Sequence, residues 1–390
     1  MRDFLTERAR RLQPSGIRKY FDLVEQMPDA ISLGVGEPDF VTPWDVRSAG
    51  IRSLQKGYTQ YTGNRGLIEL RVLIARYLGE RFAVEASPDR MIVTVGASEG
   101  IDLALRATCE IGDEILVPDP AYVSYAPIIG LCGGSAVAVQ CTAENGFILT
   151  PEALERAVTN KTKALILAYP NNPTGAIMNK AQLEAIVPFI KKHDLLVIAD
   201  EIYGELTYGE RHCSIASLDG MRERTVLLGG FSKAFAMTGW RVGFACAPDA
   251  IDAAMLKIHQ YTMLCAPRVS QHAAVRALSG GFESGFSAVE EMRAEYDRRR
   301  RYFVGALNEL GLRCFEPRGA FYVFPSVKST GMTGEAFADA LLREQHVAVV
   351  PGSAFGACGE YHVRCSYATG MRELMQAILR IEKFLRSRNL

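Results

Sequence analysis

The sequence predicts an α/β protein with a mostly parallel, seven-stranded sheet and a smaller α+β unit. Near-continuous apolar runs alternate with helical segments between residues 91 and 245, as in sheets covered by helices on both faces. The chain has 390 residues, enough for a large core and a second unit. The seven runs are Met91–Val95, Glu114–Val117, Ala136–Val139, Ala164–Ala168, Leu195–Ala199, Thr225–Leu228 and Val242–Ala245.

Polar or glycine-rich clusters follow five of these predicted strands. Open α/β sheets bind ligands outside the carboxyl ends of their strands, so we expect the five clusters to meet in one crevice. The clusters are Gly96–Gly100, Pro118–Tyr122, Tyr169–Gly175, Asp200–Tyr203 and Phe231–Lys233.

The segments before the sheet predict a helix, an extended connector and a loop. Residues 1–18 are expected to form an ordinary N-terminal helix, and Ile31–Phe40 forms an extended piece that ends in turn residues. The aromatic loop Tyr58–Gly66 precedes a helix around Leu67–Leu78. Such a loop more often serves packing or subunit contact than a site.

The segments after the sheet predict a separate α+β unit. Helical spacing covers Phe286–Leu310, and the run Arg298–Arg301 inside it is interpreted as a solvated helix face. Short strands at Ala320–Phe324 and His362–Ser366 and a helix near Glu373–Arg386 follow. We therefore expect a large domain at 46–290 and a small domain made of 1–45 and 291–390.

Composition limits the possible partners. Forty-four basic residues balance forty-four acidic ones, and no basic stripe interleaved with aromatic residues occurs, which argues against nucleic acid as a ligand. No run approaches eighteen apolar residues, so we expect no membrane span. The nine cysteines lack any Cys-x-x-Cys pair, which argues against a disulfide framework or a zinc site and favours a cytoplasmic protein without a metal. A small-molecule ligand is the expectation that remains.

An amine and a guanidinium lie eight residues apart where the strand Thr225–Leu228 ends. Lys233 can form an imine and Arg241 can hold a phosphate, which is the arrangement that a pyridoxal phosphate enzyme needs. Most lysines are simply solvated, so this reading depends on the other clusters.

The other clusters supply complementary groups. Asp200, directly after an apolar strand, could face a protonated pyridine nitrogen or merely cap a helix. Tyr203 and Asn172 could donate hydrogen bonds to the phenolate oxygen of such a ring. Tyr122 offers a flat face for stacking.

Two further positions carry open alternatives. Gly96-Ala97-Ser98 lies between a strand and a helix, where it could cradle a phosphate or where Ser98 could be a plain N-cap. Arg364, on a predicted strand, could clamp a substrate carboxylate or lie on the surface.

The ordered motifs resemble those of one family. They are Gly230-Phe231-Ser232-Lys233 with Gly239, Arg241 and Gly243, together with Asn172-Pro173-Thr174-Gly175, Asp200-x-x-Tyr203 and Arg364-x-Ser366-Tyr367. In this combination the chain resembles the class I/II aminotransferases of pyridoxal phosphate fold type I. Gly36–Phe40 and Tyr61-Thr62-x-x-x-Gly66 are similar to the prokaryotic-type branch, whose subgroups act on aromatic amino acids, aspartate or N-acetyl-diaminopimelate.

The resemblance implies a role for each motif residue. It implies a homodimer that transfers an amino group between an L-amino acid and a 2-oxo acid, with the active site at the subunit interface. Lys233 would carry the cofactor as an imine, Asp200 would face the pyridine nitrogen, Tyr203 and Asn172 the phenolate oxygen, and Tyr122 would stack on the ring. The implied phosphate ligands are Ala97, Ser98, Ser232, Arg241 and Tyr61 of the partner subunit, and the implied ligands of the substrate α-carboxylate are Gly36, Asn172 and Arg364.

Two positions depart from the family pattern. Gly230 stands where several relatives carry another phosphate-binding serine. Ser98 stands where some aspartate-using members carry a lysine, which argues against a dedicated aspartate enzyme. A β-lyase of the same fold is the alternative reaction. A regulatory pyridoxal phosphate module would need a DNA-binding domain, and only about thirty residues precede Ile31.

Overall fold

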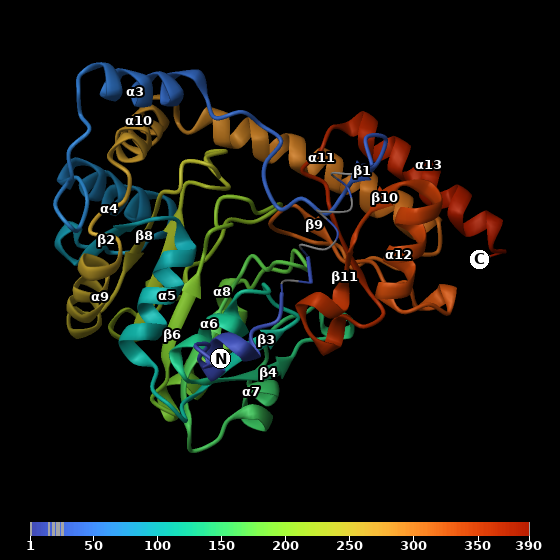
Figure 1. Ribbon diagram of the computed structural model, residues 1–390, viewed down its shortest axis with the longest axis horizontal. Helices are drawn as coiled ribbons and strands as arrows, with labels where there is room; N and C mark the ends of the chain where they lie inside the picture. Colours follow the sequence, from blue (N-terminus) through green and yellow to red (C-terminus); the bar gives the residue numbers. More distant parts are fainter. Residues whose placement is uncertain (1, 15, 18–19, 21–23, 25–26, 390) are drawn as a thin grey trace.

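A seven-stranded sheet forms the centre of the molecule, as the sequence predicted (Figure 1). The computed structural model describes residues 1–390 except 1, 15, 18–19, 21–23, 25–26 and 390. The strand order is β2-β8-β7-β6-β5-β3-β4. The strands are β2 (Met91–Thr94), β3 (Glu114–Asp119), β4 (Ser135–Gln140), β5 (Thr162–Leu167), β6 (Leu196–Asp200), β7 (Thr225–Gly230) and β8 (Gly243–Cys246).

Strand β8 is antiparallel to both of its neighbours, whereas the other pairs in the sheet are parallel. Gly243, the first residue of β8, pairs with Gly230 and Thr94, which lie at the carboxyl ends of β7 and β2. The chain just before β8 therefore reaches the same edge of the sheet as the loops that follow the parallel strands.

Helices cover both faces of this sheet, which explains the long apolar runs of its inner strands, whereas the edge strand β4 is mostly exposed. Along β7, Val226 and Leu228 pack on one face with α5, α6 and α9, whereas Leu227 packs on the other with α4, α7, α8 and α10. These helices are α4 (Ile68–Phe82), α5 (Ala97–Thr108), α6 (Tyr125–Cys132), α7 (Pro151–Ala157), α8 (Lys180–Lys192), α9 (Asp249–Thr262) and α10 (Arg268–Ser284), and α3 (Trp44–Gln55) packs on α10.

A second core lies beside the sheet and is built by both ends of the chain. Strand β1 of the N-terminal segment pairs in parallel with β10, with Ile31 opposite Val347. Three further short strands form an antiparallel sheet in the order β11-β12-β9. The elements are β1 (Ile31–Ser32), β9 (Tyr322–Val323), β10 (Val347–Ala348), β11 (Val350–Pro351), β12 (Val363–Ser366), α11 (Ser287–Glu309), α12 (Gly334–Gln345) and α13 (Met371–Ser387).

Two sequence expectations were wrong in detail. Among the described residues of the expected range 1–18, the N-terminal helix α1 covers only Glu7–Arg11, and Pro14 disfavours its continuation through Gln13; residues 1, 15 and 18 lie outside the described residues. The run Arg298–Arg301 is not uniformly solvated, since Arg299 and Arg300 are buried. Arg299 forms ion pairs with Asp39 (2.9 Å) and Glu295 (2.8 Å), and Arg300 with Asp297 and Glu316 (both 2.7 Å). These partners come from the N-terminal segment, from the helix itself and from the loop after it, which the sequence pattern could not bring together.

All nine cysteines are free thiols. Within the described part of the chain, no group of three or more His, Cys, Asp or Glu side chains is placed to hold a metal ion. Over the same residues, every helix is too short or too polar to cross a bilayer.

Candidate active site

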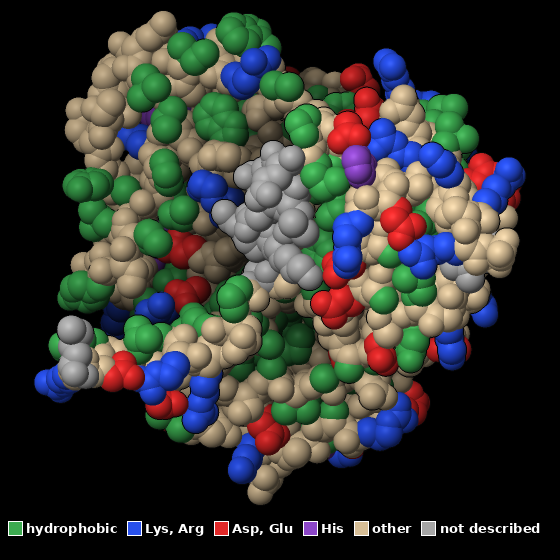
Figure 2. Space-filling model, turned by 45° about the vertical axis from the view of Figure 1, so that its right-hand side comes forward, with side chains coloured by type: hydrophobic (Ala, Val, Ile, Leu, Met, Phe, Trp, Pro, Cys, Tyr) green, Lys and Arg blue, Asp and Glu red, His purple; other side chains and the backbone are tan. Residues whose placement is uncertain are grey.

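A cavity of about 530 Å³ lies at the carboxyl edge of the central sheet. The five predicted loops converge on it, and the chain before β8 and strand β12 also reach it. Figure 2 shows the hollow between the two parts of the molecule. Eleven of the twelve predicted site residues line this cavity: Gly36, Ala97, Ser98, Tyr122, Asn172, Asp200, Tyr203, Ser232, Lys233, Arg241 and Arg364.

The Lys233 amine is partly buried in this cavity and donates a hydrogen bond from Nζ to the carbonyl oxygen of Gly36 (2.5 Å). Loss of hydration lowers the pKa of Lys233 from its usual 10.5 to about 8, with the charges of Arg364 and Arg241 acting in the same direction and Glu37 opposing them. An amine with this pKa is a much better nucleophile near neutral pH than an ordinary lysine.

We expect the cofactor-free protein to show this pKa directly. Only the neutral amine is nucleophilic, so the rate of Lys233 acylation should rise with pH and level off above about 8. The unfolded chain keeps the proton up to about 10.5, so the contribution of this group to stability should increase as the pH rises from about 8 to 10.5. Mass spectrometry of labelled peptides, with exposed Lys257 as the internal comparison, measures the rate, and a labelling rate that keeps rising through pH 10 would contradict the assignment.

Asp200 is a buried carboxylate at the end of β6. Its Oδ2 accepts a hydrogen bond from the Tyr125 hydroxyl (2.8 Å) and its Oδ1 accepts one from the Ile202 amide (3.2 Å). Burial raises the pKa of Asp200, although the Tyr125 hydrogen bond acts against the rise. Among the described residues no ion pair to Asp200 forms, so this carboxylate faces the cavity without a cation of its own.

Tyr203 and Asn172 lie on opposite sides of a small polar network. The Tyr203 hydroxyl is 2.8 Å from the Tyr322 hydroxyl, and Asn172 Oδ1 accepts a hydrogen bond from Arg364 Nη1 (2.9 Å). The Arg364 guanidinium lies over the ring of Tyr322, with its Cζ 4.5 Å from the centre of that ring. The network links the loop after β6 to strands β9 and β12 of the second core.

Two further cavity residues, Tyr125 and Tyr322, were not predicted from the sequence. Tyr125 follows Tyr122 by three residues at the start of α6, and Tyr322 is the polar-tipped residue of the predicted strand Ala320–Phe324. A buried tyrosine hydroxyl needs a hydrogen-bond partner, and that was the available signal. This rule does not identify the partner. Asp200 lies 75 residues from Tyr125 in the sequence, and Tyr203 lies 119 residues from Tyr322.

The start of α5 forms an anion site together with Arg241. Gly96, with φ 75°, is the N-cap residue and provides no side-chain cap, so the first backbone N–H groups of α5 remain free to bind a ligand. The expectation that Ser98 might be the cap was wrong, because Ser98 lies inside the first turn and is exposed. A Cβ atom at Gly96 would lie 2.6 Å from Arg241 Nη2, so only glycine allows the guanidinium to approach the turn this closely.

Arg364 is a buried cation whose hydrogen bonds leave its charge unbalanced. It is 2% exposed, and its Nη1 and Nη2 atoms donate to Asn172 Oδ1 and to the carbonyl oxygen of Gly34 (2.6 Å). No carboxylate of the described chain pairs with it, and its buried Nε has no hydrogen-bond partner there. The alternative of a surface arginine is excluded by this burial, and an incoming carboxylate would balance the charge.

Comparison with known proteins identifies the family. Residues 28–381 match the family described as "Aminotransferase class I and II". The chain is 48% identical to an aspartate aminotransferase of Pyrococcus abyssi and 45% identical to aromatic-amino-acid aminotransferase 2 of Thermococcus litoralis, each over 99% of both chains. It also matches the crystal structure of an aromatic aminotransferase from Pyrococcus horikoshii with a TM-score of 0.91 and 47% identity, over 95% of this chain and 99% of that one. The chain belongs to the class I and II aminotransferases.

The enzyme is therefore a pyridoxal 5′-phosphate-dependent aminotransferase of fold type I, and the β-lyase alternative is not supported. Its cavity has the groups that the cofactor requires. A free helix N-terminus beside Arg241 suits a phosphate, the buried carboxylate of Asp200, which forms no ion pair with a described residue, suits a protonated ring nitrogen, and the Lys233 amine suits the aldehyde.

Tyr61 is the one predicted site residue outside the cavity of this aminotransferase. It is 79% exposed on the loop between α3 and α4. Within a single chain it does not line the site.

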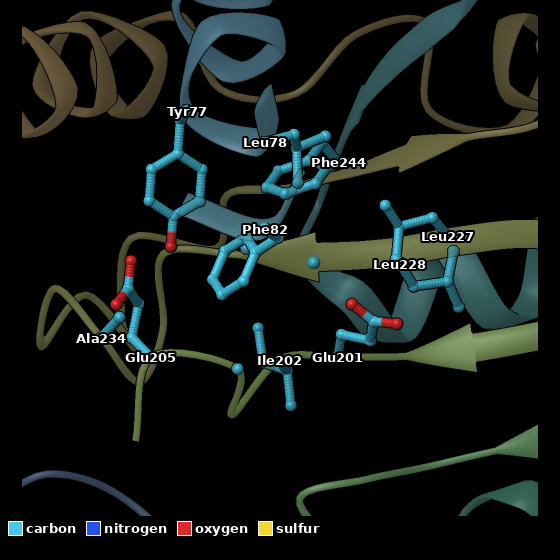
Figure 3. Close-up of a pocket in the computed structure, with 13 residues that line it drawn as sticks. Tyr77, Leu78, Phe82, Glu201, Ile202, Glu205, Leu227, Leu228, Ala234 and Phe244 are labelled. Atoms are coloured by element: carbon cyan, nitrogen blue, oxygen red, sulfur yellow. The ribbon is translucent and has the colours of Figure 1, made fainter. Parts of the chain in front are cut away.

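A second, much smaller cavity lies on the other side of the loop that follows β6 (Figure 3). Glu201, Ile202 and Glu205 line it together with Tyr77 and Phe82. Its volume of about 20 Å³ has room for roughly one water molecule, so it is not a site for cofactor or substrate.

Gly230 lines this small cavity and not the large one. A Cβ atom there would lie 3.0 Å from Gly243 Cα and 3.1 Å from Ile202 Cδ1, so the close pairing of β7 with β8 favours glycine over a serine at this position.

Proposed function

We propose that the cavity residues divide the work as their geometry suggests. Lys233 binds the cofactor, Asp200 faces its ring nitrogen, Tyr203 and Asn172 its ring oxygen, and Tyr122 its face. The phosphate is held by Ala97, Ser98, Ser232 and Arg241, with Tyr61 of the partner subunit. The substrate α-carboxylate is held by Arg364, Gly36 and Asn172. The observation that carries this proposal is the convergence of eleven of these twelve residues on one cavity.

The chemistry follows from these positions. When bound, the cofactor withdraws electrons from the substrate Cα, and Asp200 sustains that effect by keeping a negative charge beside the ring nitrogen. Tyr125 donates a hydrogen bond to Asp200 and so favours its ionised form. Arg364 would hold the substrate by its carboxylate. The Lys233 Nζ, with a pKa of about 8, would accept the proton from the substrate Cα and donate it to the cofactor carbon that had been bonded to Lys233.

For the substrate, we propose L-amino acids with aromatic or aliphatic side chains in preference to aspartate and glutamate. The cations among the described lining residues are Lys233, Arg241 and Arg364. They are already assigned to the cofactor, its phosphate and the substrate α-carboxylate, so none remains for a second substrate carboxylate. Glu37 adds a carboxylate to the lining, which would repel a second substrate carboxylate. Among the relatives, both aspartate and aromatic aminotransferases are represented.

The first half of the reaction tests this preference without an acceptor. The loaded enzyme is mixed with phenylalanine, tyrosine, leucine, aspartate or glutamate, and the change in cofactor absorbance is followed. We expect kcat/KM for the aromatic donors to exceed that for aspartate by about tenfold or more, because burying an uncompensated carboxylate is costly. Aspartate as the fastest donor would contradict the proposal. Adding a 2-oxo acid and assaying its amino product, with ammonia and pyruvate as the alternative products, checks the transfer itself.

We propose a homodimer, supported by an exposed apolar surface next to the site. Trp44, Tyr61 and Tyr261 are 64%, 79% and 87% exposed, and Val41, Ile51, Leu54, Ile68, Val72 and Met263 are also exposed. They come from α3, from the first half of α4, from the end of α9 and from the segments beside these helices. Figure 2 shows hydrophobic side chains spread over the upper left of the molecule, where Figure 1 places α3 and α10. A surface of this kind marks a protein interface.

The double substitution Ile68→Asp and Val72→Asp tests the dimer. We expect monomers in sedimentation experiments and weaker cofactor binding, because charges in an apolar interface oppose association and Tyr61 of the partner subunit would be lost. The matched control is Met375→Asp with Leu379→Asp on α13, which are also exposed apolar residues but lie on the other unit. A monomeric wild type, or a dimer that survives the first pair, would refute this interface.

We also propose the division into a large domain at 46–290 and a small domain made of 1–45 and 291–390, supported by the pairing of β1 with β10. The nine free thiols support a reducing, cytoplasmic location.

A further inference from the structure

A buried acid–base pair lies directly behind the phosphate-binding turn, outside the cavity. His259 on α9 is fully buried, and its Nδ1 is 2.6 Å from Oε1 of Glu99 in the first turn of α5. Helices α5 and α9 pack against each other along this contact. Neither residue lines the cavity, so neither touches the cofactor or the substrate.

The second carboxylate oxygen of Glu99 holds the turn itself. Glu99 Oε2 accepts a hydrogen bond from the Val95 amide (2.5 Å), and the Val95 carbonyl accepts one from Arg241 Nη2 (3.5 Å). Val95 is therefore connected on one side to the Glu99–His259 pair and on the other to the guanidinium beside the anion site.

The arrangement leaves the phosphate-binding amides open. A glutamate in the first turn of a helix commonly reaches back to the N-cap amide. Here Glu99 bonds to the residue before the N-cap, and the N-cap is a glycine without a side chain. The backbone N–H groups at the start of α5 thus stay free, while the chain that leads into them is fixed from behind.

His259 is needed to keep the Glu99 carboxylate buried beside the turn. A buried carboxylate is costly unless it is paired and hydrogen-bonded, and Glu99 is 8% exposed. Without His259, Glu99 would have to move toward water, and its bond to Val95 would be lost. The turn could then adopt several backbone conformations. Only one of them places the backbone amides of α5 and the Arg241 guanidinium so that both can bind one phosphate.

We infer that Glu99 and His259 are a positioning pair for the phosphate-binding turn, so that affinity for the phosphate group depends on a histidine that contacts no ligand. The inference rests on the proposed phosphate site at the start of α5 and Arg241, and it is independent of the proposed substrates.

The test compares two ligands that differ only in the phosphate. Pyridoxal 5′-phosphate and pyridoxal are titrated into the cofactor-free enzyme, and their dissociation constants are read from absorbance without any turnover. For His259→Leu we expect the dissociation constant of the phosphorylated ligand to rise about tenfold or more, and that of pyridoxal to change by less than about threefold, because the loss of a charge-assisted hydrogen bond is confined to the phosphate turn. His259→Asn, whose amide nitrogen can take the place of Nδ1, should recover most of the affinity.

A control for the loss of a histidine–carboxylate contact elsewhere in the protein is His346→Leu, in a pair that is more exposed than His259–Glu99. His346 Nδ1 lies at the same 2.6 Å from a carboxylate, that of Asp29, but in the second unit of the molecule. This variant should bind both ligands as the wild type does.

Two results would overturn the inference. One is an equal loss of affinity for both ligands in His259→Leu, which would mean a general structural role. The other is no loss for either. If His259→Leu fails to fold, Glu99→Ala removes the other half of the pair and must show the same phosphate-selective loss. The titration contains no substrate, so a negative result for His259 does not bear on the proposed donor preference. In the same way, a wrong donor preference does not bear on the titration.

Discussion

Lys233→Ala should lose turnover by about 10⁴-fold or more, because the variant lacks both the amine that binds the cofactor and the base that moves the Cα proton. The loss should appear in kcat, since Arg364 still holds the substrate carboxylate. The absorbance of the lysine-bound cofactor should vanish in the same variant. Steady-state kinetics and an absorbance spectrum of the same preparation measure the two effects.

The control for Lys233 is Lys257→Ala, which removes an exposed lysine of α9. It should behave as the wild type. A Lys233→Ala enzyme that keeps turnover within about a hundredfold of the wild type would contradict the assignment, because general acid–base catalysis alone contributes about 10²–10⁴. An added small amine that restores part of the rate would support it, because such an amine can replace the missing base.

Arg364→Gln should lower kcat/KM for amino acids by about 100-fold or more, because removing one partner of a buried charge pair costs about 2–5 kcal/mol. The guanidinium contacts the rings of Tyr322 and Phe355, with its Cζ 4.5 and 4.8 Å from their centres, and it borders the cavity, so little water is present to take over its role toward the carboxylate. The glutamine keeps polar character without the charge. Kinetics with a full range of amino acid concentrations separate the effect on KM from that on kcat.

A substrate without the carboxylate provides the control. The reaction of an alkylamine with the loaded enzyme should be equally slow in Arg364→Gln and in the wild type, and cofactor affinity should be unchanged within about threefold. A variant that loses the alkylamine reaction as strongly as the amino acid reaction would show that Arg364 acts on the fold or on the cofactor, and the assignment to the substrate carboxylate would be wrong.

Local patterns were sufficient to predict the fold and most of the residues that line the cavity. The seven strands could be predicted because a strand buried on both faces must be apolar along its whole length, as in Val226, Leu227 and Leu228. The five loops could be grouped because parallel strands end at one edge of a sheet. Arg241 could be added to them from its position eight residues after Lys233 and from the family motif, although nothing in the local pattern indicates that β8 runs antiparallel.

The errors share one physical origin. The buried ion pairs of Arg299 and Arg300, and the hydroxyl partners of Tyr125 and Tyr322, join residues far apart in the chain. Whether a polar side chain is solvated or buried depends on what packs over it, and the periodicity of one segment carries no record of that.

The sequence by itself determined which residue types end each strand, and therefore which reactive groups the site can contain: the amine of Lys233, the carboxylate of Asp200 and the guanidinium of Arg364. The tertiary structure alone decided their chemical state. Burial brings the pKa of Lys233 to about 8 and raises the pKa of Asp200, and packing leaves the charge of Arg364 without a carboxylate among the described residues. The reason is that the cost of a charge depends on how much water and which opposite charges surround it, and those surroundings exist only once the separate segments of the chain have packed together.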